Sequence, residues 1–129
     1  MKSATMNSLL ILGSLALVIM ISSSCNKEKD TIAIITIVDS ANHVVSGAYV
    51  KLKGTPTPGW PGDPTRLDQE MMTDALGQAK FDYSSLYHQG QAGFAVMDII
   101  TFKDSATGEG IIKIIEEETN HETVMLIPL

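Results

Sequence analysis

Apolar and polar residues alternate along much of the chain after residue 30, with the period of two that is typical of half-buried β-strands. The alternation is clearest from Gln78 onward, where Ala79, Phe81 and Tyr83 are separated by polar residues. A similar pattern occurs at residues 48–53. No stretch after residue 30 keeps a helical apolar period over ten residues. The pattern therefore predicts strands throughout.

The predicted strands are short, rich in β-branched or aromatic residues and bounded by turn formers; they cover residues 31–38, 48–53, 71–73, 78–83, 93–97, 99–103, 110–116 and 123–127. Turns are predicted at residues 39–42, 74–77, 105–108 and 117–121. Strands with this spacing favour an antiparallel sandwich. We therefore expect an all-β domain, a seven- to eight-stranded antiparallel Greek-key β-sandwich.

The phase of each strand also predicts which side chains form the core between the two sheets. We expect this core to contain Ile35, Ile37, Ala48, Val50, Leu52, Ala79, Phe81, Phe94, Val96, Ile112, Ile114, Val124 and Leu126.

A different pattern precedes the domain: Lys2 is followed by an apolar run over residues 9–21 and then by Ser22, Ser23, Ser24 and Cys25. A helix over this run would be about 20 Å long, against a hydrocarbon core of about 30 Å. The order of positive, apolar and small residues is that of a secretory signal. The serines and the single cysteine resemble the lipobox of bacterial lipoproteins, with Ser22 where that motif usually has Leu, Val or Ile.

The lipoprotein resemblance divides the chain into a signal peptide at residues 1–24, a lipidated Cys25 with a charged tether up to residue 30, and a domain at residues 31–129. It implies an outer-membrane protein attached through its amino-terminal lipid, held firmly because several acyl chains are involved. The tether also resembles the signals that send some lipoproteins to the cell surface. A plain signal peptide or an uncleaved anchor is the alternative for the leader.

Composition limits the domain and its partners. Cleavage before Cys25 leaves 105 residues, which suits one domain with one core. The remaining chain has a net charge of −7, because Lys2 is the only charged residue before Lys27. This charge argues against binding of nucleic acid and against electrostatic adhesion to anionic lipid.

Three segments carry a family resemblance: residues 35–39, 45–52 and 73–81 are similar to successive signatures of carboxypeptidase regulatory-like domains. That family has a transthyretin-like (Ig-like) sandwich fold, and its members usually act as accessory, structural or binding domains. A catalytic relative, the transthyretin-like hydrolase of urate breakdown, uses a Tyr-Arg-Gly-Ser tail. This sequence has residues 126–129, Leu-Ile-Pro-Leu, at the corresponding end, so the resemblance transfers no catalytic residue.

Candidate chemistry in the sequence is sparse. His43, His88 and His121 fall in separate predicted loops without the close spacing of paired metal ligands, so solvated histidines are favoured. The acidic residues at 116–118 and 122 could attract calcium, but they lack a calcium-loop pattern, and a solvated turn is favoured. No serine lies in a nucleophile motif. We therefore expect no catalytic site, no metal site and no cofactor.

Residues 54–64 contain four of the five prolines and the single tryptophan, and are predicted to form a long loop. Trp60, flanked by Pro58 and Pro61, is the predicted binding site, because an exposed aromatic in a stiffened loop suits protein or glycan contacts. The alternative is that Trp60 packs as a lid over a sheet edge.

Together these observations predict a non-enzymatic outer-membrane lipoprotein whose β-sandwich acts as a binding or assembly module, with an envelope protein as its partner. The alternative is a surface-exposed accessory module that binds carbohydrate or another nutrient for a transporter.

Overall fold

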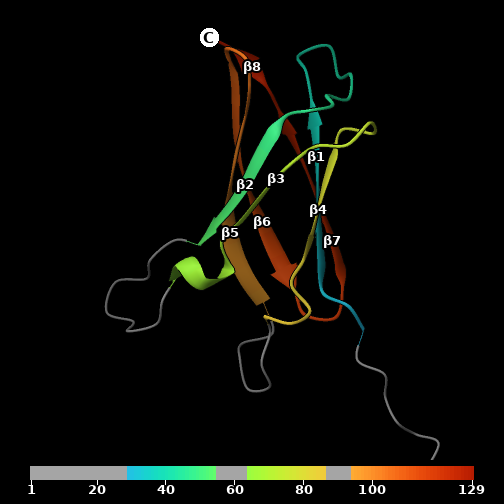
Figure 1. The fold of residues 1–129 in the computed structure, drawn as a ribbon, viewed down its shortest axis with the longest axis vertical. Coiled ribbons are helices and arrows are strands. Elements are labelled where there is room, and N and C mark those ends of the chain that lie inside the picture. Colours follow the sequence, from blue (N-terminus) through green and yellow to red (C-terminus); the bar gives the residue numbers. More distant parts are fainter. Residues whose placement is uncertain (1–28, 55–63, 87–93) are drawn as a thin grey trace, which may run out of the picture.

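The structure is a computed structural model that describes residues 29–54, 64–86 and 94–129 (Figure 1). Its elements are β1 (Ile32–Val38), β2 (Tyr49–Gly54), the 3-10 helix η1 (Pro64–Leu67), β3 (Gln69–Met72), β4 (Gln78–Asp82), β5 (Phe94–Lys103), β6 (Ala106–Ile115), β7 (Thr119–Met125) and β8 (Ile127–Pro128). The predicted all-β class is confirmed.

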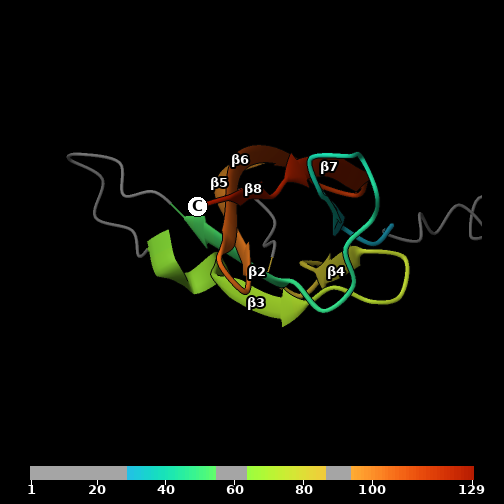
Figure 2. The ribbon, with the colours of Figure 1, turned by 90° about the horizontal axis from the view of Figure 1, so that it is seen from above.

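The strands form two sheets, one of three strands in the order β4-β1-β7 and one of five in the order β3-β2-β5-β6-β8. Seen from above, the two sheets enclose a common interior (Figure 2). Every described strand pair is antiparallel except β1 with β7, which run parallel from Ile32↔Thr119 to Val38↔Met125. The expectation of a purely antiparallel sandwich is therefore wrong at this pair, where the first described strand lies beside a late one.

Most of the predicted core is confirmed; the buried members are Ile35, Ile37, Ala48, Val50, Leu52, Ala79, Phe81, Ile112, Ile114, Val124 and Leu126. Tyr83, Met97 and Ile99 join them. The side chain of Phe94 lies outside what the structure describes. Val96 was wrongly placed in the core, because its side chain is 53% exposed.

The error at Val96 comes from the phase of β5. The sequence predicts two strands at residues 93–97 and 99–103, whereas β5 runs unbroken from Phe94 to Lys103. Met97, Ile99 and Thr101 are buried, and the residues between them point outward. Because β5 is apolar at positions of both parities, alternation could not decide which set faces the core.

The turns show a mixed outcome. The reversal at residues 74–77 is confirmed: Gly77 has φ +69°, and a Cβ added there would lie 2.8 Å from the Val44 Cβ. The turn predicted at 105–108 is wrong, because Thr107 and Gly108 belong to β6 and the hairpin loop is Asp104–Ser105. Asp104 has φ 52°, as a tight two-residue hairpin requires.

The turn predicted at 117–121 is too long, because β7 already begins at Thr119. Asn120 explains the difference. Its buried amide donates from Nδ2 to the carbonyls of Ile32 (3.1 Å), Ile115 (3.1 Å) and Glu118 (3.2 Å), and its Oδ1 accepts the Ile115 N–H (3.0 Å). A residue that usually marks a turn therefore joins β1, β6 and β7 at a corner of the sandwich.

Candidate functional site: the outer face of the five-stranded sheet

On the side away from the core, the five-stranded sheet carries both exposed apolar and charged side chains. We call this surface the outer sheet face; the strand registers place on it Tyr49, Lys51, Lys53, Glu70, Met72, Val96, Asp98, Ile100, Phe102, Thr107, Glu109, Ile111, Lys113 and Ile127. Its apolar members include Ile100 (37% exposed), Phe102 (47%) and Ile111 (60%). Contiguous apolar surface of this kind commonly marks an interaction site.

One row of the outer sheet face crosses all five strands near the loop at Asp104. The register places Met72 beside Tyr49, Tyr49 beside Phe102, and Thr107 between Phe102 and Ile127. The rings of Tyr49 and Phe102 have centroids 4.7 Å apart. This row offers two aromatic rings and two exposed aliphatic side chains to a partner.

Tyr49 is held in place at its polar end. Its hydroxyl donates to Glu70 Oε2 over 2.6 Å. This hydrogen bond to a carboxylate is the main cause that raises the pKa of Tyr49 above its usual value. Because the hydroxyl is fixed, the ring keeps one orientation against Phe102.

Charged side chains flank Ile100 in the next row, and the charged Asp98 is the central residue of the row after it. The register places Ile100 between Lys51 and Glu109, and Asp98 between Lys53 and Ile111. A hollow of about 490 Å³ lies here, lined by Lys53, Asp98, Ile99, Ile100, Glu109, Gly110 and Ile111. Among the described residues, neither Lys51 nor Glu109 has an ion-pair partner within 4 Å. On β3, Glu70 is the other register neighbour of Lys51.

The histidines and acidic residues singled out in the sequence do not form a site. His43 lies in the loop predicted for it, with Nδ1 3.6 Å from Asp39 Oδ2. His121 was predicted in a loop but is an exposed residue of β7, and His88 lies outside the described residues. Within residues 29–54, 64–86 and 94–129, no group of three His, Cys, Asp or Glu side chains is arranged to hold a metal ion.

Asp39 shapes the loop that carries His43. Its Oδ1 accepts the backbone N–H groups of Ala41 and His43, each over 2.9 Å. The hydrogen bond from the His43 backbone is the main cause that lowers the pKa of Asp39. This arrangement fixes a turn and leaves the imidazole of His43 exposed.

The predicted site residues Cys25, Pro58, Trp60 and Pro61 all lie outside the described residues. In the part of the chain that the structure describes, no helix has the length and apolar content needed to span a membrane. The outer sheet face was not predicted as a site. The signal that could have found it is β5 itself, which has apolar residues on both faces although only one face is needed for the core.

No protein-family model matches the chain, and no curated protein matches it. Solved structures do. Catechol 1,2-dioxygenase from Acinetobacter sp. ADP1, inhibited by bound mercury, aligns with a TM-score of 0.50 and 12% identity over 83% of this chain and 55% of its own. Catechol 1,2-dioxygenase from Acinetobacter radioresistens aligns with a TM-score of 0.51 and 11% identity over 83% of this chain and 54% of its own. 3-Chlorocatechol 1,2-dioxygenase from Rhodococcus opacus 1CP aligns with a TM-score of 0.50 and 10% identity over 81% of this chain and 63% of its own.

These neighbours define the class of fold and correct one expectation. This chain spans little more than half the length of the catechol 1,2-dioxygenases, and at 10–12% identity the likeness concerns the fold. The sequence-based prediction that the protein is not an enzyme is contradicted, because the fold that it shares is that of dioxygenases. The error arose because the absence of catalytic motifs and the resemblance to accessory domains were read together as an absence of catalysis.

Proposed function

We propose that this protein is a lipid-anchored outer-membrane protein whose β-sandwich binds a protein partner of the cell envelope through the outer sheet face. The observation that carries the proposal is the exposed apolar centre of that face, around Ile100, Phe102 and Ile111. Burial of such side chains is the main favourable term in protein association. The charges of Lys51 and Glu109 at its borders would add orientation.

The anchor is the second part of the proposal. Support comes from the leader, in which an apolar run over residues 9–21 ends in three serines and the single cysteine. Cys25→Ser should block both acylation and processing, so that a heavier precursor accumulates and labelled fatty acid no longer enters the protein. Labelling of the variant, or an unlabelled wild type, would refute the anchor.

We also propose a finer assignment of the fold of this domain. The signatures at residues 35–39, 45–52 and 73–81 support a carboxypeptidase regulatory-like domain of transthyretin-like, Greek-key type. Domains of this family serve as accessory or binding modules, which agrees with a role in envelope assembly.

Co-purification from detergent-solubilised envelopes tests the binding proposal. Ile100→Glu places a charge at the centre of the outer sheet face and should remove the bound partner protein, while the melting temperature stays near that of the wild type because residue 100 is outside the core. Leu76→Glu is the matched control, since Leu76 is a 67% exposed apolar residue in the β3–β4 turn. A partner retained by Ile100→Glu would contradict the proposal.

A second candidate function is binding of carbohydrate or another nutrient for a transporter, and the hollow beside Ile100 favours it. Its volume of about 490 Å³ and its mixed lining of Lys53, Glu109 and isoleucines suit a small polar ligand. Trp60, with Pro58 and Pro61, stays a predicted contact. Glycan-array binding by the wild type that is lost in Glu109→Gln would favour this function over protein assembly.

A further inference from the structure

We propose that the partner protein contributes an extended basic segment, which pairs with the open edge of β6 as an additional strand of the five-stranded sheet. This inference rests on the proposed function, because β6 belongs to the outer sheet face, and it specifies the form and the charge of the partner. It is carried by backbone groups of β6 that have no strand partner and by two glutamates that lie beside them.

The odd-numbered residues of β6 direct their backbone N–H and C=O groups away from β5. The β5–β6 hairpin closes around a two-residue loop, so the hydrogen-bonded pairs with β5 recur at every second residue from Ala106 onward. The pairing of Thr107 with Ile127 of β8 on the opposite side agrees with this order. At Glu109 and Ile111, which have the same orientation as Thr107, no described strand is paired with that side of β6.

β7 does not close this edge, because it passes beneath β6 on the core side. A Cβ added to Gly108 would lie 2.5 Å from the carbonyl oxygen of Met125, and one added to Gly110 would lie 2.9 Å from Val124 Cγ2. Side chains of a strand stand out of the plane of the sheet. β7 is therefore below that plane at this point, and the in-plane backbone groups of β6 stay uncovered by it.

The open part of β6 is short and bounded at both ends. β8 covers Thr107 at one end. At the other end, Ile115 donates its N–H to Asn120 Oδ1 over 3.0 Å, and its carbonyl accepts Asn120 Nδ2 over 3.1 Å. Residues 109–113 lie between these limits, and we call them the β6 gap. A partner segment of about five residues fits here, since paired strands match residue by residue.

The β6 strand of a second copy does not fit the β6 gap. If Lys113 of one copy lay opposite Glu109 of another in an antiparallel pair, Ile115 of the first would lie opposite Thr107 of the second. β8 already occupies that position, and Asn120 occupies the edge of Ile115. Other antiparallel registers bring more of the strand against one of these two features. The β6 gap therefore suits a separate extended segment.

Two glutamates beside the β6 gap specify a basic partner. Glu109 has no ion-pair partner within 4 Å among the described residues. Glu122 of β7 is the register partner of the buried Ile35, so it faces the inner side of its sheet, yet it is exposed. It lies in β7 between Asn120, at one end of the gap, and Val124, beneath the other end. The two carboxylates therefore lie on opposite faces of the sheet beside the gap.

The side chains around the β6 gap predict the order of residues in the segment. Neighbouring residues of an added strand point to opposite faces. In an antiparallel pair, Glu109 favours a basic residue directly opposite, and Glu122 favours one opposite Ile112, which faces inward. Ile111 favours an apolar residue, and Lys113 a neutral one. From its amino end, the matching segment is polar, basic, apolar, small and basic.

The test measures amide hydrogen exchange of the full-length protein in mild detergent, with and without an excess of the capped peptide Thr-Lys-Ile-Ser-Lys. The amides of Glu109 and Ile111 should exchange at least about tenfold more slowly with the peptide, because they become hydrogen-bonded. The same peptide with N-methyl groups on its isoleucine and final lysine keeps its charges but cannot donate to β6, and should give no protection. Equal protection by both peptides, or protection by neither, would overturn strand addition.

Charge variants test the chemistry of the segment. Glu109→Gln and Glu122→Gln should each weaken peptide binding about threefold, as measured from the peptide concentration needed for protection. Glu118→Gln is the matched control, since Glu118 is an exposed carboxylate in the β6–β7 turn outside the β6 gap. If Glu118→Gln weakens binding as much as the other two variants do, the peptide is attracted by net charge alone, and the assignment of the site is overturned.

Two substitutions at one position separate failure of this inference from failure of the proposed function. Ile111→Pro removes an edge N–H that does not bond to β5, and proline is tolerated on edge strands; Ile111→Thr keeps the N–H. In co-purification from envelopes, the threonine variant should retain a partner protein that the proline variant loses. A partner retained by Ile111→Pro but lost in Ile100→Glu overturns strand addition and leaves the proposed function standing. A partner retained by both of these variants refutes both proposals.

Discussion

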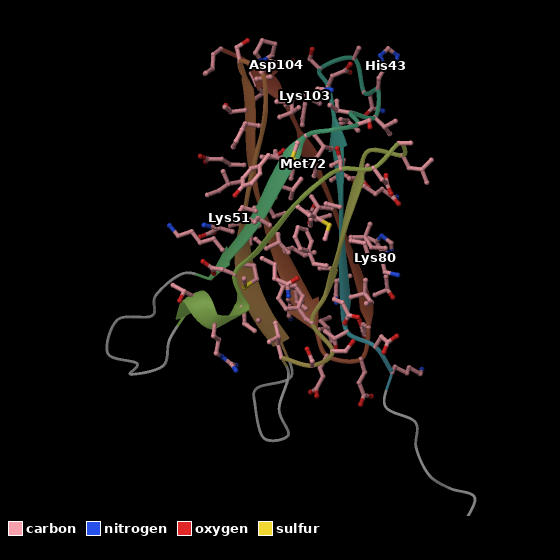
Figure 3. The ribbon with its side chains drawn as sticks, viewed as in Figure 1. His43, Lys51, Met72, Lys80, Lys103 and Asp104 are labelled. Carbon is pink, nitrogen blue, oxygen red and sulfur yellow. The ribbon has the colours of Figure 1, made fainter. Side chains whose placement is uncertain are left out.

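The outer faces of the two sheets differ in a way that their inner faces do not. On the three-stranded sheet, β4 contributes Gln78, Lys80 and Asp82, while Ile34 on β1 and Met125 on β7 also face outward. On the five-stranded sheet, β5 contributes Val96, Ile100 and Phe102. Lys80 on β4 and Lys51 on β2 extend from opposite sides of the molecule (Figure 3).

The comparison of the two sheets shows which apolar side chains are explained by folding and which are not. Both inner faces are buried in one core, so their apolar side chains are explained by folding. The polar outer residues of β4 form the ordinary solvent-facing side of the antiparallel β1–β4 pair. The exposed apolar side chains of the outer sheet face are not part of that core.

The difference in stability cost between replacing a buried and an exposed side chain should be largest at β4. Phe81→Ala removes a fully buried ring and should lower the free energy of unfolding by about 3 to 5 kcal/mol. Lys80→Ala, one residue away on the polar face, should change it by less than about 0.5 kcal/mol. Urea unfolding of the two variants measures both, and similar costs would mean that the strand phase is wrong.

On β5 the same contrast should appear between two apolar neighbours. Met97 is 1% exposed and Val96 is 53% exposed. Met97→Ala should therefore cost about 2 to 5 kcal/mol, and Val96→Ala less than about 0.5 kcal/mol. A larger cost for Val96→Ala than for Met97→Ala in denaturant titrations would mean that Val96 faces the core, as the sequence predicted. The apolar residues assigned to the outer side of β5 would then be wrong.

Two buried threonines differ in the hydrogen bonds of their hydroxyl groups. Thr73 Oγ1 donates to the Val45 carbonyl (2.7 Å) and accepts the Ala48 N–H (2.9 Å), so Thr73→Val should cost about 1 to 3 kcal/mol. The buried Thr101 hydroxyl has no hydrogen-bond partner among the described residues. Thr101→Val should therefore raise the free energy of unfolding by about 1 kcal/mol. Thermal melts of both variants decide whether their effects have opposite signs.

The smallest expected effect is a pH dependence at the β1–β2 loop, away from both faces. Because the pKa of Asp39 is lowered in the folded state, its contribution to stability is complete above the ordinary value of 3.8 and is lost as the pH falls through the lowered pKa. Asp39→Asn should remove this part of the acid dependence. Melting temperatures recorded between neutral and acid pH should show a smaller decrease for the variant; an unchanged decrease would contradict the assignment.

The sequence predicted the three-stranded sheet best at β1 and β4. Ala79 and Phe81 lie between polar residues, so only one phase buries the apolar set, and the structure has that phase. Gly77 marked the preceding turn because a left-handed conformation favours glycine.

Other elements could not be predicted for physical reasons. β5 is apolar at both parities, so either phase satisfies local patterning, and the choice depends on packing against the other sheet. Asn120 indicated a turn, but its amide satisfies backbone groups of three different segments, which no local pattern reveals.

The candidate site depends on the same difficulty. An exposed Ile100 and a buried Ile99 are indistinguishable in the sequence, and only the register with β2 and β6 shows which of them faces outward. The alignment of Lys51, Ile100 and Glu109 in one row across three strands is likewise a property of the assembled sheet. A search for catalytic or metal-binding motifs would not detect such a surface.

The parallel pairing of β1 with β7 has a consequence for how the chain folds. β1 is the central strand of its sheet, and one of its two neighbours is formed by residues 119–125. During synthesis, β1 can meet β4 early, but almost the whole domain must emerge before β7 covers the other edge of β1. Contacts so distant in sequence slow folding, and an uncovered strand edge promotes aggregation. A chain shortened before Thr119 should therefore accumulate as insoluble protein or be degraded.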